Sequence, residues 1–191
     1  MRVIAGTSRG RSFRAPVGAP TRPTTDRVRE AVFDVLGSML APDGLEGADV
    51  VDLFAGSGAF GIEALSRGAA RAVFVERHRT AATTVAANLT ATGLSGPSAR
   101  VVQSDVMAFV NTPHSFDVAF CDPPYEFDDW EELLGSLHAE LAVLESDRPV
   151  PATSRWETLR ERRYGSTIVT VVRALRSAES QGVPVSEKGA P

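Results

Sequence analysis

The residues VVDLFAGSGAFGIEALSRG, positions 50–68, predict a strand, a glycine loop and a helix in direct succession. Four of the first five residues are apolar and two of them are valines, as in a strand buried on both faces. Gly56, Gly58 and Gly61 follow in a G-x-G-x-x-G arrangement, and Gly68 is placed to end the helix. Such glycines let a ligand approach backbone N–H groups at a helix N-terminus, so this stretch predicts a nucleotide- or nucleoside-binding loop.

The order strand, loop, helix then repeats along the chain, which predicts a mostly parallel sheet with helices on both faces. We expect further strands at 72–76, 99–105, 116–122, 141–146 and 167–175, and helices at 80–92, 107–110 and 130–141. A small N-terminal extension precedes this α/β body: a β-hairpin over residues 1–16, whose turn lies between Gly6 and Gly10, a loop, and a helix that begins near Asp26. The expected division is an extension over 1–25, a Rossmann-like domain over 26–176 and a disordered polar tail over 177–191.

Composition narrows the classes of function. The chain has 191 residues, 43% of them hydrophobic, which suits one catalytic domain. It has one cysteine, Cys121, expected in the core, and three scattered histidines, so neither redox chemistry nor a metal site is expected. No apolar run approaches the ~20 residues of a membrane span, and the N-terminus lacks the apolar core of a signal peptide. We expect a cytoplasmic protein without membrane contact, and a monomer, because the pattern contains no large exposed apolar helix face.

Charge is distributed unevenly. The net charge is −4, yet residues 1–29 contain seven arginines against a single acid, Asp26, and carry +6. Arginine suits phosphate because its planar fork can donate two hydrogen bonds to one group. The segment therefore predicts a basic arm that contacts a polyanion, with a solvated charged terminus as the alternative. The candidate arginines are Arg2, Arg9, Arg11, Arg14, Arg22 and Arg27.

Acidic residues follow three successive strands: Asp52, Glu76 and Asp105. Asp52 would repel the pyrophosphate of a dinucleotide but could pair with the α-amino group of S-adenosylmethionine. Glu76 could accept hydrogen bonds from ribose hydroxyls, and Asp105 from the adenine amino group. Helix caps or solvated loop residues are the alternative for each acid alone. The remaining expected cofactor contacts are Phe54, Ala55, Gly56, Ser57 and Gly58 in the loop, Arg77 after Glu76, and Val106 and Met107 against the adenine ring.

The sequence CDPPYEF, 121–127, ends the strand expected before it, because two prolines cannot donate ladder hydrogen bonds. Asp122 and the carbonyl of Pro123 could each accept an N–H of an amino group, Pro124 would stiffen the loop, and Tyr125 would offer a flat face to an unstacked base. Asp122 would also contact the cofactor. This motif resembles the Pro-Pro motif of S-adenosylmethionine-dependent methyltransferases that act on exocyclic amino groups of bases. The resemblance implies a class I methyltransferase fold.

A narrower resemblance covers the chain to about residue 176. MRVIAGTSRGRSFRAP, TRPTTDRVREAVFDVL, DLFAGSGAFGIEALSRGA, VERH and DPPY resemble the bacterial RsmD family. That resemblance implies methylation of the 2-amino group of guanine 966 in 16S ribosomal RNA, on naked RNA, an assembly intermediate or the small subunit. It also implies that Thr24, Thr25 and Arg27 lie near the cofactor and the RNA. Segment 146–163 has no role implied by either pattern or resemblance.

Three other functions fit parts of the pattern. An amino-methyltransferase acting on adenine or cytosine in DNA or another RNA could use the same four-residue motif, although little chain remains after Tyr125 for a target-recognition domain. A nucleotide-dependent oxidoreductase could use the glycine loop, but Asp52 and Asp105 argue against it. A non-catalytic RNA-binding module could retain the fold, but the intact motif argues against that function.

Overall fold

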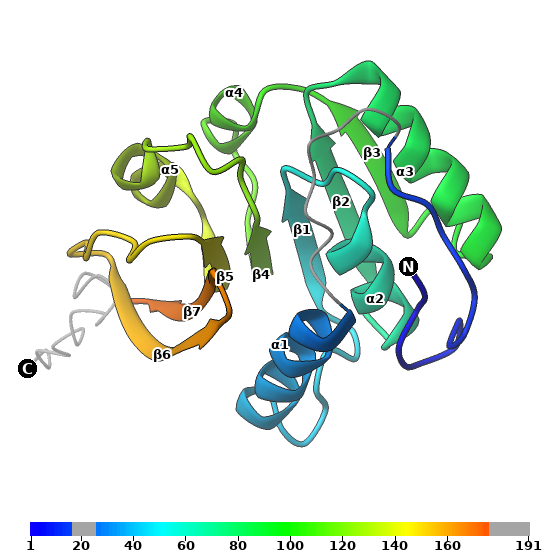
Figure 1. Cartoon of the computed structure of the whole chain (residues 1–191), viewed down its shortest axis with the longest axis horizontal. Coiled ribbons are helices and arrows are strands. Elements are labelled where there is room, and N and C mark those ends of the chain that lie inside the picture. Colours follow the sequence, from blue (N-terminus) through cyan, green and yellow to red (C-terminus); the bar gives the residue numbers. More distant parts are fainter. Residues whose placement is uncertain (17–25, 176–191) are drawn as a thin grey trace, which may run out of the picture.

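The computed structural model describes residues 1–16 and 26–175, and its centre is a seven-stranded sheet in the order β3-β2-β1-β4-β5-β7-β6 (Figure 1). The strands are β1 Asp49–Leu53, β2 Arg71–Glu76, β3 Ala99–Gln103, β4 Phe116–Cys121, β5 Ala139–Ser146, β6 Trp156–Tyr164 and β7 Thr167–Ala174. Strands β1 to β5 are parallel, and β7 runs antiparallel to both β5 and β6. The strand order reverses between β1 and β4, which is the point at which open α/β sheets bind ligands.

Helices cover the two faces of the sheet. They are α1 Asp26–Met39, α2 Ala59–Ser66, α3 Arg79–Thr92, α4 Val106–Val110 and α5 Trp130–Ser136. Side chains from α1, α2 and α3 share one apolar cluster with the sheet, and those from α4 and α5 share the other. Alternate residues of β1 enter the two clusters, Val50 the first and Val51 the second, as a strand covered on both faces requires. The Rossmann-like fold is thereby confirmed.

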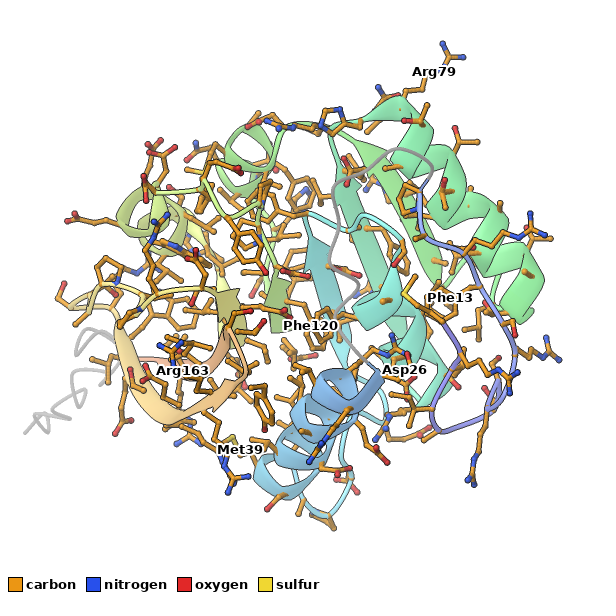
Figure 2. The ribbon with its side chains drawn as sticks, in the orientation of Figure 1. Phe13, Asp26, Met39, Arg79, Phe120 and Arg163 are labelled. Atoms are coloured by element: carbon orange, nitrogen blue, oxygen red, sulfur yellow. The ribbon has the colours of Figure 1, made fainter. Side chains whose placement is uncertain are left out.

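Aromatic packing joins α1 to the centre of the sheet. Phe120 of β4 stacks on Phe60 of α2 with ring centroids 5.0 Å apart, and it contacts Phe33 of α1 at 5.5 Å. Figure 2 shows Phe120 in the middle of the molecule, above α1. Since all three rings are nearly inaccessible to solvent, α1 is part of the core and not an appendage.

The N-terminal segment is a loosely paired hairpin that is bound closely to the helices. Its two arms share one β-bridge, between Arg2 and Ser12, instead of forming two regular strands. The N–H groups of Ile4 and Ala5 donate to the two carboxylate oxygens of Glu63 in α2, at 2.8 and 3.0 Å. The bonds to Glu63 add to the backbone bonds between the two arms, such as Val3 N to Arg11 O at 3.0 Å, and they anchor the segment to α2.

The structure departs most from the expectation at α5 and at β6, a strand that the sequence pattern did not predict. Helix α5 ends at Ser136, whereas the sequence pattern predicted helix to 141, because the chain from Ala139 pairs with β4 and continues as β5. The end of the segment without an assigned role is strand β6, which pairs with β7 along its whole length. Residues 17–25 and 176–191, including the expected tail, lie outside the described residues.

Candidate cofactor and substrate cleft

A cleft of about 510 Å³ lies at the carboxyl ends of the parallel strands. Its walls come from segments far apart in the sequence: the N-terminal segment, the glycine loop, the turn after β2, the start of α4, the loop after β4 and the turn after β5. The lining residues are Met1, Ala15, Pro16, Asp52, Phe54, Ala55, Gly56, Ser57, Ala59, Phe60, Glu76, Arg77, His78, Thr80, Ala81, Val106, Asp122, Pro123, Pro124, Tyr125, Glu126, Phe127, Trp130, Glu145, Ser146, Asp147 and Arg148.

The glycine loop turns sharply into α2. Phe54, Gly56 and Gly58 have φ angles of 60°, 54° and 79°, in the left-handed region that disfavours a Cβ atom. Phe54 is the one non-glycine residue with positive φ among the described residues, and it lines the cleft. Backbone strain at such a residue is of the order of 1–3 kcal/mol and persists where the surroundings fix the conformation. The loop is therefore held in a shape that presents its backbone to a ligand.

Asp52 lies under this loop and is 2% exposed. Its Oδ2 accepts a hydrogen bond from Gly61 N at 2.9 Å. Burial raises the pKa of Asp52 to about 8, against the bond from Gly61, and the nearby carboxylates of Asp122 and Glu76 add to this shift. A cationic group in the cleft would favour the ionised form, so the α-amino group of S-adenosylmethionine suits this carboxyl.

Glu76 ends β2 with its carboxylate fixed by the backbone. Gly56 N donates to Oε2 at 2.9 Å and His78 N donates to Oε1 at 2.8 Å. A carboxylate oxygen can accept more than one hydrogen bond, so both retain capacity for ribose hydroxyls. The same two bonds hold the glycine loop next to the turn after β2.

The third expected acid is placed differently. Asp105 is exposed and caps α4, its Oδ1 accepting from Met107 N at 2.9 Å and from Ala108 N at 3.3 Å. Of the three expected adenine contacts, Val106 lines the cleft, whereas Asp105 and Met107 do not; Arg77, an expected cofactor contact, lines it too. The helix cap, one of the two alternatives for Asp105, is the role that the geometry shows.

The loop after β4 forms the opposite wall. Asp122 follows the last residue of β4, and Pro123, Pro124 and Tyr125 continue along the cleft. The side chain of Tyr125 is 42% exposed, and its ring is therefore accessible to a partner. Among the described residues, Leu175 is the other large hydrophobic side chain that is exposed. Asp122 thus shares one cleft with Asp52 and Glu76, as the sequence predicted.

Sequence reasoning missed several residues of this wall. Arg148, in the turn after β5, donates to the carbonyl oxygen of Tyr125 at 2.8 Å and forms an ion pair with Asp128 at 2.9 Å. The Phe127 ring packs edge-on against Phe54 and Trp130, with centroids 5.2 and 5.3 Å away. A signal was present, since a Phe and a Trp so close to a Pro-Pro motif are candidates for a base or adenine platform.

Asn88 of α3 was also missed. It is 3% exposed, and its side-chain Nδ2 donates to the carbonyl oxygens of Ser57 and Arg14, both at 2.8 Å. Its Oδ1 accepts from Arg14 N at 3.0 Å. One buried amide therefore joins the glycine loop to the N-terminal segment. A polar residue on the apolar face of a predicted helix is the signal that could have identified it.

The arginines of the basic arm do not gather at one place. Arg29, counted in the +6 segment, is 0% exposed and lies between Asp26 and Glu63, so it is not available to a polyanion. The hairpin turn bonds to the C-terminal ends of α2 and α3, with Arg11 donating to Thr92 O at 2.7 Å. Helix α3 has 14 residues and is thus roughly 20 Å long. Its first turn lines the cleft, so Arg11 and the neighbouring Arg9, in the turn that bonds to its other end, lie remote from the cleft.

The other candidates are distributed as follows. Arg2, Arg14 and Arg27 are exposed, and Arg14 adjoins the cleft-lining Ala15 and Pro16. Arg22, Thr24 and Thr25 lie outside the described residues. Cys121 is 1% exposed and packs in the second apolar cluster, and burial raises its pKa, so it behaves as the core residue that was expected.

Two further observations concern the parts of the chain that the structure describes. No group of three or more histidine, cysteine, aspartate or glutamate side chains there is arranged to hold a metal ion. None of the helices there combines the length and apolar character that crossing a membrane requires.

A sheet of this order, with a cofactor loop after β1 and a fixed carboxylate at the end of β2, defines a Rossmann-like class I S-adenosylmethionine-dependent methyltransferase. The family model described as "Conserved hypothetical protein 95" matches residues 1–173. The chain belongs to this family, the RsmD family.

Similar proteins agree over nearly the whole chain. Ribosomal RNA small subunit methyltransferase D of Escherichia coli K12 is 36% identical, over 95% of this chain and 92% of its own length. YlbH of Bacillus subtilis is 39% identical, over 89% of this chain and 91% of its own. The solved structure of yhhF from Escherichia coli superposes with a TM-score of 0.78 at 34% identity, covering 91% of this chain and 97% of that one.

Proposed function

We propose that this protein transfers a methyl group from S-adenosylmethionine to the exocyclic 2-amino group of a guanine, at position 966, in 16S ribosomal RNA of the small subunit. One observation carries the chemistry: the Asp122-Pro123-Pro124-Tyr125 loop opens into the cleft that also contains Asp52 and Glu76. The name of the 36% identical Escherichia coli relative supports ribosomal RNA as the substrate. The choice of guanine and of its position rests on the family resemblance.

Cofactor binding divides between the two buried acids. Asp52 would bind the α-amino group and Glu76 the ribose hydroxyls, while the backbone of Gly56, Ser57 and Gly58 lies against the cofactor. Bound S-adenosylmethionine supplies an electrophilic methyl group on a sulfonium. The chain therefore has to bring one nucleophilic nitrogen in line with that methyl group and to exclude water.

Asp122 and Pro123 then act on the target nitrogen. An exocyclic amino nitrogen is a poor nucleophile because its lone pair is delocalised into the ring. Hydrogen bonds from its two N–H groups to the Asp122 carboxylate and the Pro123 carbonyl favour a pyramidal nitrogen whose lone pair faces the methyl group. The carboxylate also stabilises the positive charge that develops on the nitrogen as the new N–C bond forms and the methyl–sulfur bond breaks, and it could accept the proton that the nitrogen then loses.

Tyr125 would bind the base by stacking. A base stacked within a helix cannot enter a cleft in the protein, so the target must be unpaired or flipped out. The half-exposed ring of Tyr125 offers the surface, and the bond from Arg148 to its carbonyl oxygen holds the loop in place. We place the reaction in the cytoplasm, on RNA or a small-subunit particle, with the protein acting as a monomer and residues 1–25 as an RNA-contacting extension.

The test is methyl transfer from radiolabelled S-adenosylmethionine to small subunits, naked 16S RNA and DNA, followed by nucleoside analysis. Label is expected in 2-methylguanosine and should fall ~10²-fold or more in Asp122→Asn, with cofactor affinity nearly unchanged. Asp43→Asn, in an exposed loop outside the cleft, is the matched control and should keep full activity. Label in methyladenine, methylcytosine or DNA would overturn the assignment of guanine, and full activity of Asp122→Asn would overturn the role of Asp122.

A further inference from the structure

The surroundings of the cleft differ in charge from one side to the other. On the α5 side, Glu126, Asp128, Asp129, Glu131 and Glu132 are all exposed within seven residues. Arg148 neutralises one of them through its ion pair with Asp128. A polyanion cannot approach favourably over such a surface. An RNA whose base enters this cleft must therefore run toward another side.

Strand β6 offers the opposite charge. Between Arg160 and Tyr164 it has three exposed arginines, Arg160, Arg162 and Arg163, and one glutamate, Glu161. None of the three arginines forms an ion pair within residues 1–16 and 26–175. Because β6 is the outermost strand of the sheet, no other strand of the described residues pairs with its outer edge. Figure 2 shows Arg163 on this strand, well away from α3 and Arg79.

The register of the sheet places these arginines beside the cleft. Arg162 is paired with Val169 of β7, and Val169 with Glu145 of β5, which lines the cleft. Strands lie about 4.8 Å apart, so the Cα atom of Arg162 is roughly 10 Å from that of Glu145. Alternation along the strand directs Arg160 and Arg162 to the face of the sheet that α1 covers, next to Val35 and Tyr164.

We propose that the cleft-side half of β6 binds the phosphate backbone of the RNA next to the target nucleotide, with Arg160 and Arg162 as its two principal contacts. The proposal rests on the proposed function, because it needs an RNA substrate in the cleft. It gives a role to the segment that neither the motifs nor the family resemblance explained. Charged side chains on an edge strand also prevent sheet-to-sheet association, and the test must separate that role from RNA binding.

The test compares two double variants with the same change of net charge. Arg160→Gln/Arg162→Gln removes the proposed contacts. Arg100→Gln/Arg173→Gln removes two exposed arginines of the same sheet, Arg100 on the opposite edge strand β3 and Arg173 on β7 opposite Leu141, at the end of β5 remote from the cleft. Binding of the small subunit and of naked 16S RNA is measured between 50 and 300 mM salt, together with methyl transfer, binding of S-adenosylhomocysteine and sedimentation.

Each phosphate contact contributes about 0.7–0.9 to the slope of log K against log salt, so the first variant should show a slope shallower by roughly 1.4–1.8. Its KM for RNA should rise roughly three- to thirty-fold with kcat and S-adenosylhomocysteine binding unchanged. The control variant should match the wild type. Equal slopes in the two variants would overturn the proposal, as would association of the first variant into oligomers with unchanged RNA affinity. Absence of methyl transfer by the wild-type protein would instead overturn the proposed function.

Discussion

Asp52→Asn is expected to stabilise the protein against unfolding while weakening its binding of the cofactor. In the unfolded chain Asp52 titrates near 3.8, and in the folded protein its pKa is about 8. The folded state therefore retains a proton that the unfolded state releases, and stability falls as pH rises from about 4 to 8. Each unit of pKa difference corresponds to 1.36 kcal/mol. The unfavourable contribution is thus about 2 kcal/mol at pH 5 and about 4 kcal/mol at pH 7.

Asparagine at position 52 removes this contribution, because it carries no proton to release and its side-chain oxygen can still accept the bond from Gly61 N. Urea unfolding of wild type and variant at pH 4, 5, 6 and 7, without cofactor, measures the difference. The variant should be more stable by about 4 kcal/mol at pH 7, a rise in Tm of roughly 8–16 °C, and the difference should disappear toward pH 4.

Ligand binding provides the second half of the test. S-adenosylhomocysteine has the same α-amino group, so its affinity for wild type should rise between pH 6 and pH 8, as Asp52 ionises, and should show no such rise in Asp52→Asn. If the two proteins differ in stability by the same amount at every pH, Asp52 does not have a raised pKa. The assignment of its carboxyl to the α-amino group would then lose its physical basis.

Two other substitutions test contacts that tie the N-terminal segment to the body. Glu63→Gln removes the charge that faces the fully buried Arg29 at 3.8 Å and should destabilise the protein by about 3–5 kcal/mol in urea unfolding. The double variant Glu63→Gln/Arg29→Met should recover part of this loss. An unaltered unfolding midpoint in the single variant would contradict the buried ion pair. Asn88→Ala breaks the hydrogen bonds to Ser57 and Arg14 and should weaken the binding of S-adenosylhomocysteine, measured by calorimetry, about ten-fold. The control Asn111→Ala, at an exposed position, should bind as the wild type does. Equal affinities of the two variants would show that Asn88 does not support the glycine loop.

The sequence was most informative where residue type and local geometry are tightly linked. The glycines after β1 could only form a sharp turn, and the two prolines after Cys121 could only end a strand, so the cleft and its Asp52, Glu76 and Asp122 were predicted. The expected helix near Asp26 is α1, which begins there. Because each of these residues lies at or just after the carboxyl-terminal half of a parallel strand, the strand order of such a fold places them at the same end of the sheet.

Other features depend on tertiary contacts that local patterns do not contain. TLRERRY in β6 has almost no apolar alternation, because an edge strand is half solvated and its order comes from pairing with β7. The stretch WEELLGSLHAEL favours helix throughout, yet its last residues, from Ala139 on, form the start of strand β5. Arg29 contributed to a count of basic residues, but Glu63 lies 34 positions further on and only the fold brings them together.

The insertion of β7 between β5 and β6 also fixes when the sheet can be completed during synthesis. Strand β5 has no partner on its outer side until Thr167–Ala174 has left the ribosome, although its residues Leu141–Leu144 are buried and apolar in the finished sheet. A nascent chain that ends before Thr167 thus presents an unprotected apolar edge, a template for aggregation. The last strand of the described chain therefore completes the sheet, because β7 pairs with β5 on one side and with β6 on the other.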